Sequence, residues 1–131
     1  SWLSRAAYVS SDRFVEDYAE QQGKTYTEVF EGYIGHALGL MEQAAMQARL
    51  EQRDIVWDQT STTVKTRAKK LRMLPDYFKI AVVFKIPDPV TLKARLDSRP
   101  GKNIPDHVMR SMIDSFEMPT EEEGFKEIWY T

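Results

Sequence analysis

The sequence predicts an α/β fold in which helices cover both faces of a mostly parallel sheet. Residues 80–84 form a continuous apolar and β-branched run, which is typical of a strand buried on both faces in a parallel sheet. Along the chain, short strand-like segments alternate with longer segments of helical periodicity. Neither an internal repeat nor a linker interrupts this alternation. We therefore expect a single domain over residues 1–131.

The N-terminal segment has the pattern of a helix end, a strand and a second helix. Residues 2–7 resemble the end of a helix that is already under way, and residues 8–10 resemble a short strand. A helix over residues 13–22 is predicted next, because Ser11 and Asp12 offer a cap and apolar residues supply one side.

A long helix is predicted over residues 25–51. Its apolar residues recur in steps of three and four and mark one buried face: Phe30, Ile34, Leu38, Met41, Ala45 and Ala48. Three glycines lie inside the same stretch: Gly32, Gly35 and Gly39. Glycine lowers helix stability, so we expect close packing of this backbone against a sheet to compensate.

The rest of the chain continues the alternation of strands and helices. The predicted elements are a strand, a helix, a strand, two helices and a strand, over residues 53–57, 63–74, 80–84, 88–98, 105–116 and 125–130. Asp88 and Pro89 are suited to begin a helix, as is Pro105.

The composition excludes several classes of protein. The net charge is −2, so only a local patch of the chain could bind a polyanion. The absence of cysteine excludes disulfides, thiolate zinc sites and a cysteine nucleophile, and it is compatible with a cytoplasmic protein. No apolar run approaches the roughly 18 residues of a membrane span, so we expect no membrane partner.

Two aspartates follow predicted strands. Asp12 comes after residues 8–10, and Asp58 comes after residues 53–57. In open α/β sheets ligands bind beyond the carboxyl ends of strands, where a carboxylate can accept a proton from a hydroxyl or hold Mg²⁺. Aspartates also cap helices and form turns, so both explanations stay open for each residue.

Basic residues gather in two segments. The helix at 63–74 carries five of them: Lys65, Arg67, Lys69, Lys70 and Arg72. Such a run of basic residues is ordinarily a solvated helix face. The alternative interpretation is a patch that binds a polyanionic substrate. Arg95 and Arg99 share one face at a helix end, where the dipole favours cations. With Lys102 in the turn that follows, they also suit a lid that closes over phosphates.

Four segments fit one family in the right order. Residues 58–67 read Asp-Gln-Thr-Ser-Thr-Thr-Val-Lys-Thr-Arg, close to a pattern of Asp-Asn-Thr-Asn followed by a helix near Lys/Arg-x-Arg. Residues 95–105 hold two arginines four apart, a small residue, Lys and a Pro-led helix. Residues 116–125 end in Pro…Glu-Gly-Phe, and residues 9–14 match a segment with a general-base aspartate. Together they resemble the P-loop kinase group that includes the polynucleotide 5′-hydroxyl kinases.

The chain departs from that family at several positions. Gln59 and Ser61 stand where the family has asparagines, and Val15 stands where it often has an arginine that Arg13 could replace. The sequence contains no G-x-x-x-x-G-K-S/T motif, and residues 1–3, Ser-Trp-Leu, resemble those just after the Ser/Thr of that motif. The resemblance therefore implies a P-loop NTPase-type three-layer sandwich that lacks its first strand and P-loop here. We expect about ten to twenty further N-terminal residues in the natural protein, the size of a strand plus a P-loop.

The resemblance implies an ATP-dependent kinase that uses ATP and Mg²⁺ and phosphorylates the 5′-hydroxyl end of a nucleic acid. The resemblance implies Asp12 and Arg99 as catalytic residues and Asp58 as the metal ligand. It implies that the ATP phosphates are bound by Ser1, Arg95 and Lys102. It implies that the substrate is bound by Arg13, Lys65 and Arg67. Lys65 and Arg67 could instead contact a loop of the domain itself. Two alternatives stay open, which are a noncatalytic nucleic-acid or nucleotide-binding module of the same fold and a kinase for a small-molecule or nucleotide-sugar acceptor.

Overall fold

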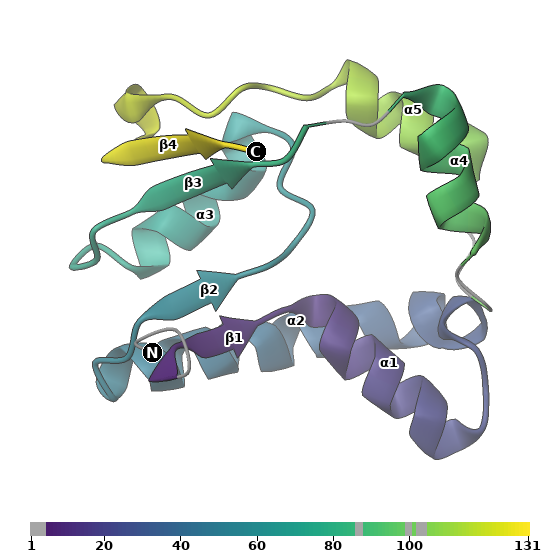
Figure 1. Ribbon diagram of the computed structural model, residues 1–131. Coiled ribbons are helices and arrows are strands. Elements are labelled where there is room, and N and C mark those ends of the chain that lie inside the picture. Colours follow the sequence, from purple (N-terminus) through teal and green to yellow (C-terminus); the bar gives the residue numbers. More distant parts are fainter. Residues whose placement is uncertain (1–4, 86–87, 99–100, 102–104) are drawn as a thin grey trace. The chain divides into compact units, whose positions relative to one another are not determined.

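The computed structural model places two compact units along the chain (Figure 1). The residues it describes are 5–85, 88–98, 101 and 105–131. The first unit comprises residues 1–60 and 99–103, and the second comprises residues 61–98 and 104–131. Each unit contains a two-stranded parallel sheet and helices, so the predicted α/β class and parallel strands are confirmed. The expectation of a single domain stays a prediction.

The described residues of unit 1 form two strands and two helices. In chain order they are β1 (Ala7–Val9), α1 (Ser11–Gln22), α2 (Tyr26–Leu50) and β2 (Ile55–Trp57). The strands β1 and β2 run parallel, with Tyr8 opposite Val56 and Val9 opposite Trp57. Because parallel strands share their direction, both carboxyl ends lie at the same edge of this sheet. Residues 2–4 of the expected helix end lie outside the described residues, and Ala7 belongs to β1.

The core of unit 1 lies between the two helices and β1. It is made by small and medium-sized apolar residues: Val9, Val15, Ala19, Ala37, Met41, Ala45 and Ala48. The predicted buried face of α2 is confirmed in the second half of the helix. In its first half the prediction is wrong, because Phe30 is 37% exposed and Ala37 is fully buried.

The glycines of α2 do not mark a close approach. A Cβ atom placed on Gly32, Gly35 or Gly39 would meet no atom within 4 Å. All three glycines are exposed. The expectation that packing against a sheet explains them is therefore wrong in this structure, and nothing in unit 1 accounts for them.

Unit 2 contains the remaining elements. They are α3 (Val64–Met73), β3 (Ile80–Val83), α4 (Pro89–Asp97), α5 (Asp106–Asp114), the short 3₁₀ helix η2 (Glu121–Glu123) and β4 (Glu127–Tyr130). The strands β3 and β4 run parallel, with Ala81 opposite Ile128 and Val82 opposite Trp129. Asp88 caps α4 as predicted, because its carboxylate accepts hydrogen bonds from the amide and hydroxyl of Thr91 at 3.0 and 2.7 Å.

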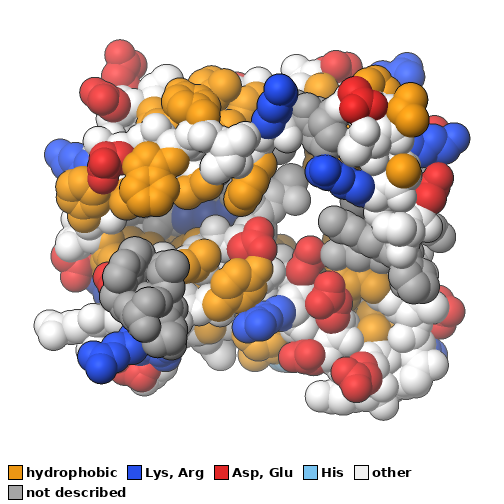
Figure 2. All heavy atoms as spheres, in the orientation of Figure 1, with side chains coloured by type: hydrophobic (Ala, Val, Ile, Leu, Met, Phe, Trp, Pro, Cys, Tyr) orange, Lys and Arg blue, Asp and Glu red, His pale blue; other side chains and the backbone are white. Residues whose placement is uncertain are grey.

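The strand β3 is buried on one face only, so the prediction of burial on both faces is wrong. Ala81 is 9% exposed, whereas Ile80 and Val82, on the opposite face, are 37% and 46% exposed. Figure 2 shows hydrophobic side chains at the surface over the β3–β4 sheet. The described residues of unit 2 cover the Ala81 face and leave the other face to solvent, which explains the difference.

No helix in the described parts of the chain combines the length and the apolar character needed to cross a bilayer. The longest is α2, which has 25 residues and carries charged side chains at both ends. Its bounds differ from the prediction by one residue at each end, because the Thr25 side chain caps its first turn.

Candidate functional site

Asp12 lies one turn beyond the carboxyl end of β1. Ser10 has extended backbone angles and occupies the N-cap of α1, so Asp12 falls in the first turn of the helix. Of the two explanations that the sequence leaves open for Asp12, the one as N-cap is therefore wrong. The Asp12 side chain is exposed.

The Asp12 carboxylate accepts a hydrogen bond from a tyrosine of the other helix. The hydroxyl of Tyr26, the first residue of α2, lies 2.6 Å from Oδ1 of Asp12. Burial, and then this hydrogen bond to a carboxylate, raise the pKa of Tyr26 well above its ordinary value. The hydroxyl consequently keeps its proton at neutral pH and acts as a donor to Asp12.

Asp58 follows β2 at the same edge of the sheet. Its amide donates a hydrogen bond of 2.8 Å to the carbonyl oxygen of Val9, which extends the pairing of β1 with β2. Its carboxylate accepts a hydrogen bond from the hydroxyl of Tyr8. That bond is the main reason why the pKa of Tyr8 is raised, and the charge of Asp12 acts in the same direction. The negative charges of Asp12 and Asp58 therefore both act on the Tyr8 hydroxyl and raise its pKa.

Arg13 completes this group of residues. Its guanidinium carbon lies 4.6 Å from the centroid of the Tyr8 ring, a cation–π distance. Its positive charge opposes the rise in the pKa of Tyr8. We call the five residues Tyr8, Asp12, Arg13, Tyr26 and Asp58 the carboxylate cluster. It places a proton acceptor, a second carboxylate and an exposed cation at the carboxyl end of parallel strands, where such folds bind ligands.

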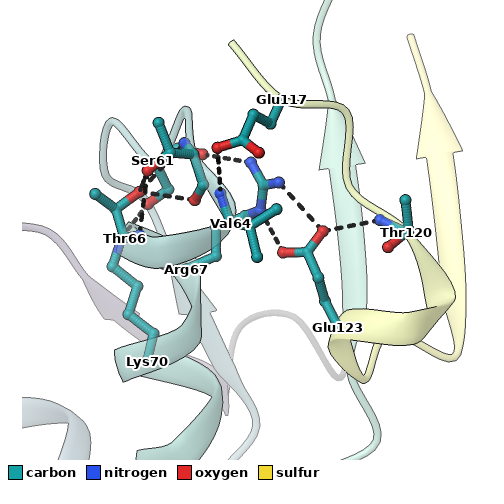
Figure 3. Close-up of polar contacts among 9 residues, drawn as sticks. Ser61, Val64, Thr66, Arg67, Lys70, Glu117, Thr120 and Glu123 are labelled. Atoms are coloured by element: carbon teal, nitrogen blue, oxygen red, sulfur yellow. Dashed lines mark hydrogen bonds and ion pairs between the residues drawn. The ribbon is translucent and has the colours of Figure 1, made fainter. Parts of the chain in front are cut away.

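Arg67 in unit 2 is not a surface cation. It is 6% exposed, and its Nε and Nη2 atoms donate to the two carboxylate oxygens of Glu123 at 2.8 and 3.2 Å (Figure 3). Its Nη1 atom donates to the carbonyl oxygen of Ser61 at 3.0 Å. Of the two roles expected for Arg67, these contacts favour the one with the domain's own loop over contact with substrate.

Lys70, one turn further along α3, is partly buried beside Arg67. Its ammonium group donates to the hydroxyl of Ser61 (Figure 3). Burial, and then the neighbouring charge of Arg67, lower the pKa of Lys70 to about 8. The start of α3 is also held by Glu117, whose carboxylate accepts the Val64 amide at 3.3 Å. These contacts fix the loop after residue 60 to the C-terminal segment of unit 2.

The two other predicted site residues that the structure describes, Lys65 and Arg95, lie outside the carboxylate cluster and outside the contacts of Arg67. Lys65 on α3 and Arg95 on α4 are exposed in unit 2. Ser1, Arg99 and Lys102 lie outside the described residues.

Gly101 belongs to unit 1 and contacts the first turn of α2. Its carbonyl oxygen accepts hydrogen bonds from the amide and the hydroxyl of Thr27 at 3.0 and 2.8 Å. A Cβ atom on Gly101 would lie 2.7 Å from the Cβ atom of Thr25, and the glycine has a φ of 71°. Only glycine meets both conditions without strain.

The described residues suit a Mg²⁺ ion that is held partly by waters and substrate phosphates better than a metal ion that is held by protein side chains alone. Among the described residues there is no group of three or more histidine, aspartate or glutamate side chains placed to hold an ion. Magnesium is commonly bound through one or two carboxylates together with waters and substrate phosphates. Asp58, exposed and oriented by Tyr8, is suited to that role.

Sequence analysis missed both tyrosines of the cluster. The sequence does contain a signal for Tyr8. Side chains along a strand alternate between the two faces of the sheet, so Tyr8 shares a face with every second residue of the neighbouring strand. No local signal identifies Tyr26, which is 14 residues from Asp12 and reaches it only because α1 and α2 pack together.

Comparison with known proteins places most of the chain in one family. The model of the AAA domain family designated AAA_33 matches residues 2–119. No curated protein matches the chain.

Proposed function

The chain belongs to the AAA domain family, which includes kinases of the P-loop type, and we propose that it is an ATP-dependent kinase whose phosphate acceptor is a polynucleotide 5′-hydroxyl. Its α/β fold with parallel strands is of the P-loop NTPase type. Family membership supports nucleotide binding and phosphoryl transfer in general. The acceptor, Mg²⁺ and a cytoplasmic setting belong to our proposal.

The observation that carries the proposal is the state of Asp12. Its carboxylate follows a parallel strand, does not cap its helix and is held by a tyrosine hydroxyl at 2.6 Å. As a general base it would accept the proton of the acceptor hydroxyl. The hydroxyl oxygen then bonds to the γ-phosphorus as the bond to the bridging oxygen breaks, and ADP leaves with that electron pair.

Asp58 would hold Mg²⁺ directly or through a bound water, with Tyr8 fixing its carboxylate. When bound, Mg²⁺ neutralises charge on the transferring phosphates. Arg95, exposed at the end of α4, would supply further positive charge, and Arg99 and Lys102 belong to the same proposal.

Arg13 would contact a phosphate of the acceptor strand. It is exposed, next to Asp12 in sequence, and its guanidinium lies over the Tyr8 ring. Stacking on a ring limits the conformations of an arginine and leaves its donors directed outward, an arrangement suited to phosphate. Lys65, exposed on α3, is a second candidate for acceptor contact.

Transfer of labelled γ-phosphate from ATP to a 5′-hydroxyl oligonucleotide tests the proposal. We expect Asp12→Asn to lose at least 100-fold in kcat, within the range for removal of a general base. Asp17→Asn is the matched control, because Asp17 is an exposed aspartate on the same helix. Equal activity of the two variants would show that Asp12 is not the base.

A second candidate is a noncatalytic nucleic-acid or nucleotide-binding module. The observation that favours it is the exposure of three basic residues on α3, Lys65, Lys69 and Arg72, which could bind a polyanion without any catalysis. Binding of Mg-ATP by the full-length protein discriminates the two candidates. Binding without transfer to oligonucleotides would redirect the search to small-molecule or nucleotide-sugar acceptors, and absence of binding would favour the module.

A further inference from the structure

We propose that Tyr26 is a positioning residue for the general base, because its hydroxyl fixes the orientation of the Asp12 carboxylate. This inference rests on the proposed function and names a residue that neither composition nor motif analysis identified. Tyr26 touches no substrate in this proposal and acts through Asp12 alone.

The hydrogen bond between Tyr26 and Asp12 has the geometry that such a role requires. The donor–acceptor distance of 2.6 Å is short, as expected for a hydroxyl that donates to a charged carboxylate. A bond to Oδ1 limits rotation of the carboxylate about its last torsion, so it also fixes the direction of Oδ2. A general base works only when its accepting atom is within hydrogen-bond reach of the proton that it takes.

The turn that carries Tyr26 is anchored on both sides. Thr25 before it caps α2, and its side chain accepts the Glu28 amide at 3.2 Å. Thr27 after it donates twice to the carbonyl oxygen of Gly101. The close approach of Gly101 to Thr25 leaves little room for the turn to move. A supporting residue held in this way can define the position of a catalytic group to within a fraction of an ångström.

The Tyr26 ring is supported by apolar contact as well as by the backbone. Its centroid lies 5.5 Å from that of Phe30, one turn along α2, in a tilted arrangement. Other charged and titratable groups also influence this pair electrostatically. Glu16, on the next turn of α1, adds negative charge near the Tyr26 hydroxyl, and Arg13 and Tyr8 lie on the side of Asp58.

Tyr26→Phe tests the proposal by removing one oxygen atom and keeping the ring. We expect kcat for phosphate transfer to fall roughly five- to tenfold, the loss expected for one hydrogen bond to a charged group at an exposed site. We expect KM for ATP to stay within about twofold. A hydrogen bond that favours the charged carboxylate is lost, so the acidic limb of the pH–rate profile should move to higher pH.

Tyr33→Phe is the matched control. Tyr33 lies two turns further along α2, and its ring stacks on Tyr18 with centroids 3.9 Å apart. Among the described residues no hydrogen bond of its hydroxyl is recorded. This variant should match the parent protein in kcat and in pH profile, and circular dichroism of both variants establishes that they fold.

The outcomes separate this inference from the proposed function. If Asp12→Asn is inactive and Tyr26→Phe behaves like Tyr33→Phe in kcat and pH profile, the positioning role is wrong and the kinase proposal stands. If Asp12→Asn retains activity, the proposed base itself is wrong. A ¹³C NMR titration of the aspartate carboxyl groups gives a readout that is independent of catalysis. An unchanged Asp12 titration in Tyr26→Phe would also overturn the inference.

Discussion

Glu123→Gln is expected to destabilise unit 2 by about 3 kcal/mol. Glu123 lies in η2 and pairs with Arg67 through two hydrogen bonds, and the two side chains are only 6% and 7% exposed. The same carboxylate accepts the amide of Thr120 at 2.9 Å, so it serves as an ion-pair partner and as a cap at once.

The magnitude follows from what glutamine can replace. Its amide keeps one oxygen acceptor and turns the other position into a donor, which faces the Arg67 guanidinium in either orientation and the Thr120 amide as well in one of them. The loss of one charge-assisted hydrogen bond costs about 1.5–3 kcal/mol. Leaving a buried arginine without its carboxylate costs about 3–5 kcal/mol. Arg67 retains its bond to the Ser61 carbonyl, which places the expected value near the lower of these limits.

Urea unfolding followed by circular dichroism measures this change, and Glu122→Gln is the control because Glu122 is exposed in the same short helix. A loss of about 3 kcal/mol moves the midpoint by about 1–2 M. Arg67 lowers the pKa of Glu123 from its ordinary 4.5, so this stability is present above about pH 4.5 and is lost as pH falls through the folded value. The difference between parent and variant should therefore narrow in acid. A loss below 1 kcal/mol at pH 7, or an equal loss in the control, would refute the reasoning.

Three further predictions concern other parts of the chain. Gly101→Ala should destabilise the protein by more than about 1–2 kcal/mol in urea unfolding, because alanine is strained at a φ of 71° and its Cβ atom would also clash with Thr25; an unchanged midpoint would contradict this. Lys70 should titrate near pH 8 when its side chain is followed by NMR, because burial lowers its pKa to about 8; titration near the ordinary lysine value of 10.5 would contradict the lowered pKa. Tyr8→Phe should raise the Mg²⁺ concentration for half-maximal activity roughly tenfold, as loss of an outer-sphere partner does; no change would argue against metal binding by Asp58.

The periodic elements of the fold could be predicted from sequence because each follows from local residues. The helix α2 was predicted to within one residue at each end, since its apolar residues recur regularly and Thr25 is a good cap. Exposure could not be predicted in the same way. The apolar run of β3 indicated burial on both faces, but burial depends on which segments cover the strand, and Val82 is 46% exposed.

The candidate site was predictable in position and not in its contacts. Asp12 and Asp58 were identified because residues after parallel strands face the ligand side of such folds. Their tyrosine partners depend on how α1 packs on α2 and β1 on β2, which no local pattern encodes. Arg67 illustrates the same limit, because its partner Glu123 is 56 residues away and a run of basic residues gives no sign of it.

The contact between Thr27 and Gly101 imposes an order on folding. The two residues are 74 positions apart, and closing a flexible loop of that length costs about 4 kcal/mol in chain entropy, from (3/2)RT ln n. Residues 61–98 belong to unit 2 and lie within that loop, so their folding shortens the flexible length that remains to be closed. On the ribosome, α1 and α2 emerge long before Gly101 does. The turn that carries Tyr26 therefore acquires its second anchor among the last events of folding, and the α1–α2 hairpin must persist without it until then.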